Sequence, residues 1–110
     1  MLAIYQLLKE HGYTDDNIIL IMADDIAGNS NNPEPGTVRV TPGGSNLYTD
    51  VHIDYHLSDI KPDDFCNILA GNATGTTPNV LTGDESTNLF VFWSGHGTPG
   101  ALCWDEITNG

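Results

Sequence analysis

The pattern of apolar and polar positions predicts a helix followed by a buried strand at the start of the chain. Apolar residues recur at helical spacing from Met1 to about His11, and Gly12 follows as a natural stop. The predicted buried side of this helix consists of Ile4, Leu7 and Leu8. Residues Ile18 to Ala23 are continuously apolar and β-rich, which is typical of a strand covered on both faces. Helix, short turn and buried strand together make half of a βαβ unit.

A second helix and a second buried strand are predicted in the other half of the chain. Pro62 suits the first turn of a helix that ends at Gly71. Its predicted buried face is formed by Phe65, Ile68 and Leu69. Leu89–Trp93 reads as a buried strand, Ala101–Trp104 as a short return strand and Thr49–Leu57 as the place of a short edge strand. This order predicts an α/β fold with a mostly parallel sheet flanked by helices.

The segment from Gly28 to Gly44 is a loop rich in Asn, Pro and Gly. Val38 and Val40 could form a short extended stretch within it. A loop of this length in a compact domain is usually functional or disordered.

Size and charge narrow the classes of function. The 110 residues suffice for one small domain, and the net charge of −12 argues against binding to nucleic acid or to an anionic membrane surface. No apolar run approaches the length that spans a bilayer, and no segment reads as a secretory signal peptide or other targeting segment. Because the chain begins within a predicted helix and ends just after a strand, at Asp105–Gly110, we expect it to be part of a longer domain. Asn72-Ala73-Thr74 is an N-glycosylation sequon, which has meaning only in a secreted protein.

The strongest chemical signal is a histidine at the end of the second predicted buried strand. His96 stands between Gly95 and Gly97, directly after Trp93-Ser94. Open α/β sheets collect their active groups where strands end, and glycines allow another molecule to approach the backbone. An imidazole there can act as a general base. The alternative is an ordinary turn that contains a histidine.

Neither cysteine has the surroundings of a nucleophile in the sequence. Cys103 lies on the predicted return strand between Leu102 and Trp104, which favours a packing role. Cys66 lies beside Phe65 in the second helix and reads as a small core residue. Two cysteines also do not make a disulfide framework.

A second group of polar residues alternates along the predicted edge strand. His52, Asp54 and His56 would face one way and could bind a metal ion, but an exposed edge with outward polar residues explains them better. Asp24 and Asp25 end the first buried strand and could bind an ion, although capping of the following turn is the simpler reading.

Motifs along essentially the whole chain resemble one family of peptidases. The matching segments, in chain order, are Ala3–Gln6, Gly12–Ile19, Met22–Ala27, Asn32–Val38, Val51–Tyr55, Phe65–Gly71 and Phe90–Gly100. In order and spacing they resemble the legumain family of cysteine peptidases, the asparaginyl endopeptidases, whose domain is caspase-like.

The resemblance implies a role for two residues. His96 inherits the place of the catalytic base, and Gly97 that of a backbone N–H donor to the oxyanion hole. It further implies a peptide or protein substrate, no cofactor and no metal, and a lysosomal or vacuolar location. Residues 1–110 would then be a partial caspase-like peptidase domain.

Two departures from the family pattern bear on function. The family's nucleophile belongs to a Glu-Ala-Cys-like motif at the end of a later strand, and its orienting asparagine and pocket arginine precede the first helix; this sequence contains neither part. Legumains commonly carry aspartate where this chain has Gly95. That glycine is more similar to the catalytic subunit of glycosylphosphatidylinositol transamidase, which works with membrane partners, whereas the Pro33–Gly36 loop and Asp54-Tyr55 favour legumain.

The sequence therefore supports three readings of function. The first is a legumain-like endopeptidase that hydrolyses peptide bonds after asparagine, of which this part alone would be inactive. The second is the transamidase subunit. The third is a non-catalytic, caspase-like binding or scaffold domain, in which the long loop could bind a partner.

Overall fold

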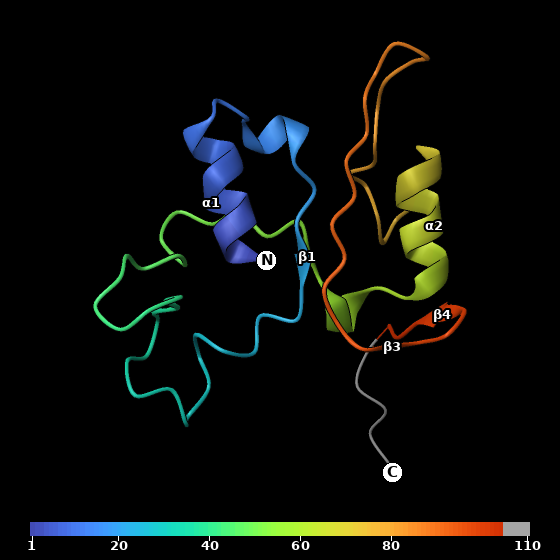
Figure 1. Cartoon of the computed structure of the whole chain (residues 1–110). Helices are drawn as coiled ribbons and strands as arrows, with labels where there is room; N and C mark the ends of the chain where they lie inside the picture. The colour runs from blue at the N-terminus through green and yellow to red at the C-terminus, as the bar shows by residue number, and fades with distance from the viewer. Residues whose placement is uncertain (105–110) are drawn as a thin grey trace. The chain divides into compact units, whose positions relative to one another are not determined.

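The computed structural model describes residues 1–104, which contain short helices and very short strands (Figure 1). The expected chain end at Asp105–Gly110 lies outside the described residues. In chain order the elements are α1 (Leu2–Glu10), the 3-10 helix η1 (Asp15–Asn17), β1 (Ile21–Met22), β2 (Tyr55–His56), the 3-10 helix η2 (Leu57–Asp59), α2 (Pro62–Ala70), β3 (Gly97–Thr98) and β4 (Ala101–Leu102). The chain folds as two compact units, Met1–Ser58 and a second unit that begins at Asp59.

The first unit is built around α1, whose bounds match the sequence prediction. Its buried residues are Leu2 and Tyr5, which form a core with Leu20, whereas Leu7 is 52% exposed. The prediction that Leu7 belongs to the buried side of the helix was therefore wrong. The side of α1 that faces the core carries Leu2 and Tyr5 instead. Tyr5 can be buried because its hydroxyl donates to Asp15 Oδ1 at 2.6 Å and accepts the His52 N–H at 3.1 Å.

A parallel pair of strands, β1 and β2, joins two distant parts of this unit, with Ile21 opposite Tyr55 and Met22 opposite His56. Both strands lie inside their predicted ranges, but each has only two residues, and β1 is half-buried rather than covered on both faces. Just before β2, a side chain takes the place of a backbone acceptor in the strand pairing: Asp54 Oδ2 accepts the Leu20 N–H at 2.8 Å. The Leu20 carbonyl in turn accepts the Asp54 N–H at 3.0 Å.

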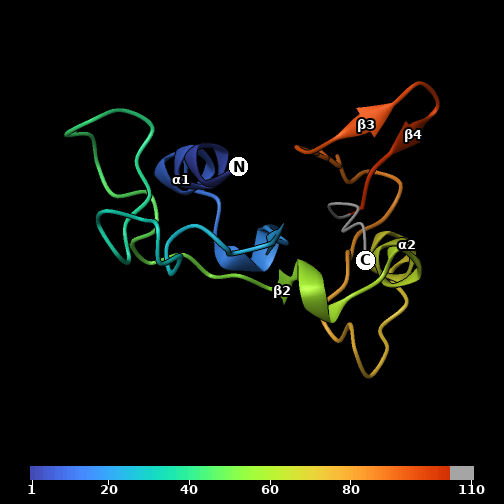
Figure 2. The same ribbon diagram turned by 90° about the horizontal axis from the view of Figure 1, so that it is seen from below.

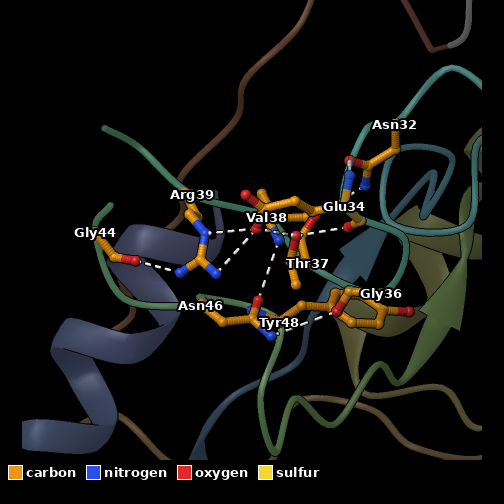
Figure 3. Close-up of polar contacts among 9 residues, drawn as sticks. All are labelled: Asn32, Glu34, Gly36, Thr37, Val38, Arg39, Gly44, Asn46 and Tyr48. Carbon is orange, nitrogen blue, oxygen red and sulfur yellow. Dashed lines mark hydrogen bonds and ion pairs between the residues drawn. The ribbon is translucent and has the colours of Figure 1, made fainter. Parts of the chain in front are cut away.

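Polar side chains give the long loop a defined shape (Figure 3). Asn46 Oδ1 accepts the backbone N–H groups of Val38, at 3.1 Å, and Tyr48, at 3.0 Å. Asn32 Nδ2 donates to carbonyls on both sides of its turn, including that of Thr37 at 3.0 Å. Arg39 forms an ion pair with Glu34 at 3.0 Å and donates to the Gly44 carbonyl. The predicted extended stretch at Val38 and Val40 is not a strand, because an asparagine side chain takes the N–H that a neighbouring strand would use.

In the second unit, α2 begins and ends as its sequence predicts. Pro62 occupies the first turn, and Asp64 Oδ2 accepts the Lys61 N–H at 2.9 Å. Gly71 ends the helix in the left-handed conformation, with φ of +74°. Ile68 is buried and Phe65 is half-buried, but Leu69 is 40% exposed, so the predicted buried face was wrong at that residue. Helix geometry explains this, because Leu69 is rotated by about 100° from Ile68.

The predicted buried strand at Leu89–Trp93 is not a strand in the structure. Leu89, Phe90, Val91 and Phe92 are all exposed, with Phe90 at 73%. A buried strand needs hydrogen-bonded neighbours and layers over its faces, and the described residues supply neither at this segment. An apolar run favours burial, but the run alone does not determine which part of the protein would cover it.

The only other paired strands in residues 1–104 are β3 and β4, an antiparallel hairpin seen in two views (Figure 1, Figure 2). The fold is therefore mixed α and β with two small sheets, of which only β1–β2 is parallel. Within the described part of the chain, no helix has the length and apolar character needed to cross a bilayer.

The contacts of Asp15 predict an acid-sensitive contribution to the stability of the first unit. Hydrogen bonds from Tyr5 and then Lys9, whose Nζ lies 3.0 Å from Asp15 Oδ2, lower the pKa of the Asp15 carboxyl below its usual value. The pKa of this carboxyl is lower in the folded protein than in the unfolded chain, where it is about 3.9. The ionised carboxylate therefore stabilises the folded state at pH values above the unfolded-state pKa, and this contribution is lost as the pH falls through the folded-state pKa. We expect wild type to exceed Asp15→Asn in unfolding free energy at pH 7, and the difference to shrink below about pH 4. Urea titrations across pH measure this, with Asp16→Asn as the control; a pH-independent difference would contradict it.

Candidate active site

His96 lies directly before β3, at the entrance to the β3–β4 hairpin. Its side chain is exposed, and its carbonyl accepts the Cys103 N–H at 2.9 Å. The backbone of the residue is thus fixed to the opposite arm of the hairpin, while the imidazole is open to solvent. A histidine held in this way can exchange a proton with a bound molecule.

The hydrogen-bond pattern of the hairpin determines where the Gly97 N–H points. Gly97 lies opposite Leu102, and Thr98 lies opposite Ala101. Antiparallel ladders alternate between hydrogen-bonded and non-hydrogen-bonded pairs. Because the bond from Cys103 to His96 belongs to a hydrogen-bonded pair, the next pair, Gly97 with Leu102, is a non-hydrogen-bonded one. The Gly97 N–H is therefore directed away from β4, on the backbone next to His96.

Two glycines of the hairpin stand where its geometry disfavours a side chain. Gly100 has φ of +83°, a left-handed conformation that side chains disfavour. A Cβ on Gly97 would lie 3.2 Å from the Ala101 carbonyl oxygen, closer than ordinary van der Waals contact. Gly95 differs from both, because a Cβ there would meet only Trp93 Nε1 at 3.8 Å. The close turn thus favours glycine at positions 97 and 100.

Three aromatic side chains pack together at the two ends of the segment that contains His96. Trp93 precedes it and Trp104 follows it, and their ring centroids are 5.8 Å apart. Phe65 of α2 meets Trp93 edge-on at 5.4 Å and Trp104 at 5.9 Å. Trp104 Nε1 also donates to the Ile60 carbonyl at 3.3 Å. We call Phe65, Trp93 and Trp104 the aromatic cluster; it was not predicted, although its tryptophans flank the motif in the sequence.

The two cysteines are both free thiols. Cys66 is exposed, so its predicted place in the core was wrong: it lies two positions before the buried Ile68, on another side of α2. Cys103 is half-buried, which agrees with packing on the return strand. Within residues 1–104, no hydrogen bond links either thiol to the His96 imidazole.

A separate polar group lies at the end of β1 in the first unit. Asp24 has φ of +56°, and its carboxylate accepts from the Tyr48 hydroxyl at 2.7 Å and contacts His56 Nε2 at 3.0 Å. The hydrogen bond to Asp24 raises the pKa of Tyr48. Asp24 thus connects β2 to the loop, a role that replaces the predicted turn cap. The part played by Tyr48 was missed, since no local pattern relates it to Asp24.

The alternating residues of the predicted edge strand do not act as one set. His52 Nε2 lies 3.6 Å from Asp54 Oδ1, whereas His56 contacts Asp24. Asp25 is exposed. Among the residues that the structure describes, no three His, Cys, Asp or Glu side chains gather as a metal site would require.

The comparison with protein families matches nearly the whole chain to one family. The model of the Peptidase C13 family, a family of cysteine peptidases, matches residues 1–109. The chain belongs to the Peptidase C13 family. The legumain resemblance read from the sequence is thereby confirmed.

Relatives of two kinds are similar to this C13 chain. It is 38% identical to a vacuolar-processing enzyme delta-isozyme from Arabidopsis thaliana over 94% of the chain, and 35% identical to a legumain from Rattus norvegicus over 89%. It is also 36% identical to a putative GPI-anchor transamidase from Caenorhabditis elegans over 99% of the chain. The chain spans 23%, 23% and 36% of the length of these three proteins, respectively.

The left-handed Gly100 gives a local prediction for the C13 hairpin. Gly100→Ala should cost about 1–2 kcal/mol, because L-residues disfavour this conformation. Hydrogen exchange of the Cys103 N–H, which bonds to His96, should then accelerate about 5- to 30-fold. Gly75→Ala is the matched control in the same unit, because a Cβ there meets nothing within 4 Å. Equal exchange in the two variants would contradict the prediction.

Proposed function

We propose that this chain is part of a legumain-like cysteine endopeptidase with a caspase-like domain, which hydrolyses peptide bonds after asparagine. His96 is its general base and Gly97 its oxyanion donor. The observation that carries the proposal is the geometry of the hairpin entrance, where an exposed imidazole adjoins a backbone N–H directed away from β4. Membership of a cysteine peptidase family supports the same chemistry.

The proposed reaction has two steps. A cysteine from the part of the protein beyond this chain loses its proton to His96, and its sulfur attacks the scissile carbonyl carbon. The Gly97 N–H stabilises the oxyanion; the C–N bond then breaks, and His96 returns the proton to the leaving amine. In the second step, water deprotonated by His96 hydrolyses the thioester and regenerates the thiol. Neither Cys66 nor Cys103 has the thiol–imidazole contact that this role needs.

A transamidase is the second candidate, and one residue favours it. Gly95 stands where legumains commonly carry aspartate, and the relative named as a putative GPI-anchor transamidase is as similar to this chain as the legumains are. The two reactions share the acyl-enzyme and differ in the acceptor, which is water for an endopeptidase and an amine for a transamidase. Membrane partners belong to this candidate alone. The names of the vacuolar relatives favour a vacuolar or lysosomal location for the first candidate.

Substitution of His96 in the full-length protein tests the proposal. His96→Ala should lower kcat/KM on a peptide with a single asparagine by about 100- to 10,000-fold, the usual contribution of a general base. His52→Ala is the matched control, because its side chain is 59% exposed and lies in the other unit. Circular dichroism should show that both variants are folded. Turnover by His96→Ala within a few-fold of wild type would reject His96 as the base.

The product of the wild-type reaction decides between the two candidates. Cleavage to a free carboxylate after asparagine, with no increase in product when an amine is added, supports the endopeptidase. Predominant transfer to an added amine such as hydroxylamine supports the transamidase instead. A folded, full-length protein that releases neither product favours a non-catalytic binding domain.

A further inference from the structure

We propose that the aromatic cluster of Phe65, Trp93 and Trp104 positions His96 for catalysis, an inference that rests on the proposed function. Its members do not touch the reacting atoms in this assignment. They act through the backbone, by fixing the two ends of the segment from which His96 projects. The cluster and the histidine all belong to the second unit.

The first argument is that the hairpin is too small to fix itself. β3 and β4 have two residues each, and every residue of both strands is exposed. An isolated two-stranded hairpin is at best marginally stable in water. The hydrogen bond from Cys103 to His96 would therefore open often without additional support. The contact between the tilted rings of Trp93, three residues before His96, and Trp104, directly after Cys103, provides that support.

The second argument is that the cluster is anchored to a rigid element. Phe65 projects from α2, which is fixed at its start by Asp64 and at its end by Gly71. Trp104 is further held by the bond from its indole N–H to the Ile60 carbonyl, at 3.3 Å. Aromatic pairs at these distances contribute about 0.5–1.5 kcal/mol each beyond burial. The chain on both sides of His96 is thus attached to α2 and to the residues just before it.

The chemistry explains why such anchoring would matter for rate. A general base must lie within hydrogen-bond reach of the proton that it takes, and a misplacement of about 1 Å can cost about 100-fold. The same movement would leave substrate binding nearly unchanged if the substrate is held elsewhere. Loss of the cluster should therefore lower kcat far more than it changes KM.

Kinetics of the full-length protein test this inference. Trp93→Ala and Trp104→Ala should each lower kcat, per active site titrated with an irreversible, thiol-reactive peptide that ends in asparagine, by about 10- to 100-fold with little change in KM. Trp93→Phe and Trp104→Phe keep a ring in place and should recover most of kcat. Tyr13→Ala removes an aromatic side chain that is 52% exposed and serves as the control. Titration of active sites separates misplacement of the base from loss of folded protein.

Two outcomes would overturn the positioning role. One is a kcat per titrated site in both alanine variants equal to that of wild type, which would leave the cluster with packing alone. The other is a proportional rise in KM with unchanged kcat, which would assign the cluster to substrate binding. Both differ from failure of the proposed function, in which His96→Ala itself would retain activity.

A second inference concerns a modification site, and it rests on the proposed vacuolar or lysosomal location: we infer that Asn72 accepts an N-linked glycan. Asn72-Ala73-Thr74 is the one Asn-X-Ser/Thr sequence among the 110 residues. The Asn72 amide nitrogen would form the bond to the anomeric carbon of an oligosaccharide carried on a lipid diphosphate. The amide loses a proton and the lipid diphosphate leaves, so the step needs no other co-reactant.

The structure gives this sequon an accessible place. Asn72 follows the left-handed Gly71 at the end of α2, and its backbone N–H bonds to the Asn67 carbonyl at 2.9 Å. Asn72 and Ala73 are both exposed. The loop is anchored one turn later by the fully buried Thr77, whose N–H donates to Thr74 Oγ1 at 3.0 Å. A glycan would therefore project from the fold without displacing packed side chains.

Expression of the full-length protein through a eukaryotic secretory pathway tests the site. Peptide mass spectrometry after enzymatic removal of N-glycans should find aspartate in place of Asn72. Asn72→Gln should abolish the signal, whereas Thr74→Ser, which keeps the hydroxyl, and Asn88→Gln, an exposed residue outside any sequon, should retain it. Unmodified Asn72 in secreted wild type would reject the inference.

Discussion

Closure of the chain between Trp93 and Trp104 is the constraint on which the candidate site depends. The hairpin inside this segment is too short to persist by its own hydrogen bonds, and its side chains bury nothing. The packing of Trp93 and Trp104 against Phe65 adds stability that the few backbone hydrogen bonds of the hairpin do not provide. The backbone of His96 thus lies in a segment that is fixed at both ends, while its side chain stays open to solvent.

In the first unit, polar side chains rather than aromatic rings hold the segments that lack long strands. Asn46, Asp54 and Asn32 accept or donate the backbone hydrogen bonds that longer strands would have satisfied. Each bond adds only about 1 kcal/mol to stability, but a buried backbone group left without a partner would cost more. The long loop thus acquires one conformation without regular secondary structure, and Asp24 connects it to β2 through Tyr48 and His56.

The correct predictions from the sequence concerned features that are determined by neighbouring residues in the chain. The helices were found nearly to the residue because their signals, Pro62 at one end and Gly71 at the other, act within a single turn. The strand prediction at Leu89–Phe92 failed because burial depends on a partner that the run itself does not specify. Contacts between distant residues, such as Tyr48 with Asp24 or Trp93 with Trp104, leave no periodic trace and could not be predicted. His96 was located in the sequence because its neighbouring glycines are a local signal, but its role remains a proposal.

Gly95 is the residue that favours the transamidase candidate under the proposed function. The hairpin itself favours glycine at positions 97 and 100, at Gly97 because a carbonyl lies close and at Gly100 because φ is positive. Gly95 is under no such demand, since a side chain there would make only an ordinary contact with Trp93. A Cβ at position 95 is therefore compatible with this backbone, so packing does not account for the glycine. Under the proposed function, a carboxylate at position 95 would lie next to His96, where it could influence whether water or an amine attacks the acyl-enzyme. Under the proposed function, the choice of acceptor is the property that is expected to differ between this protein and legumains that carry the aspartate.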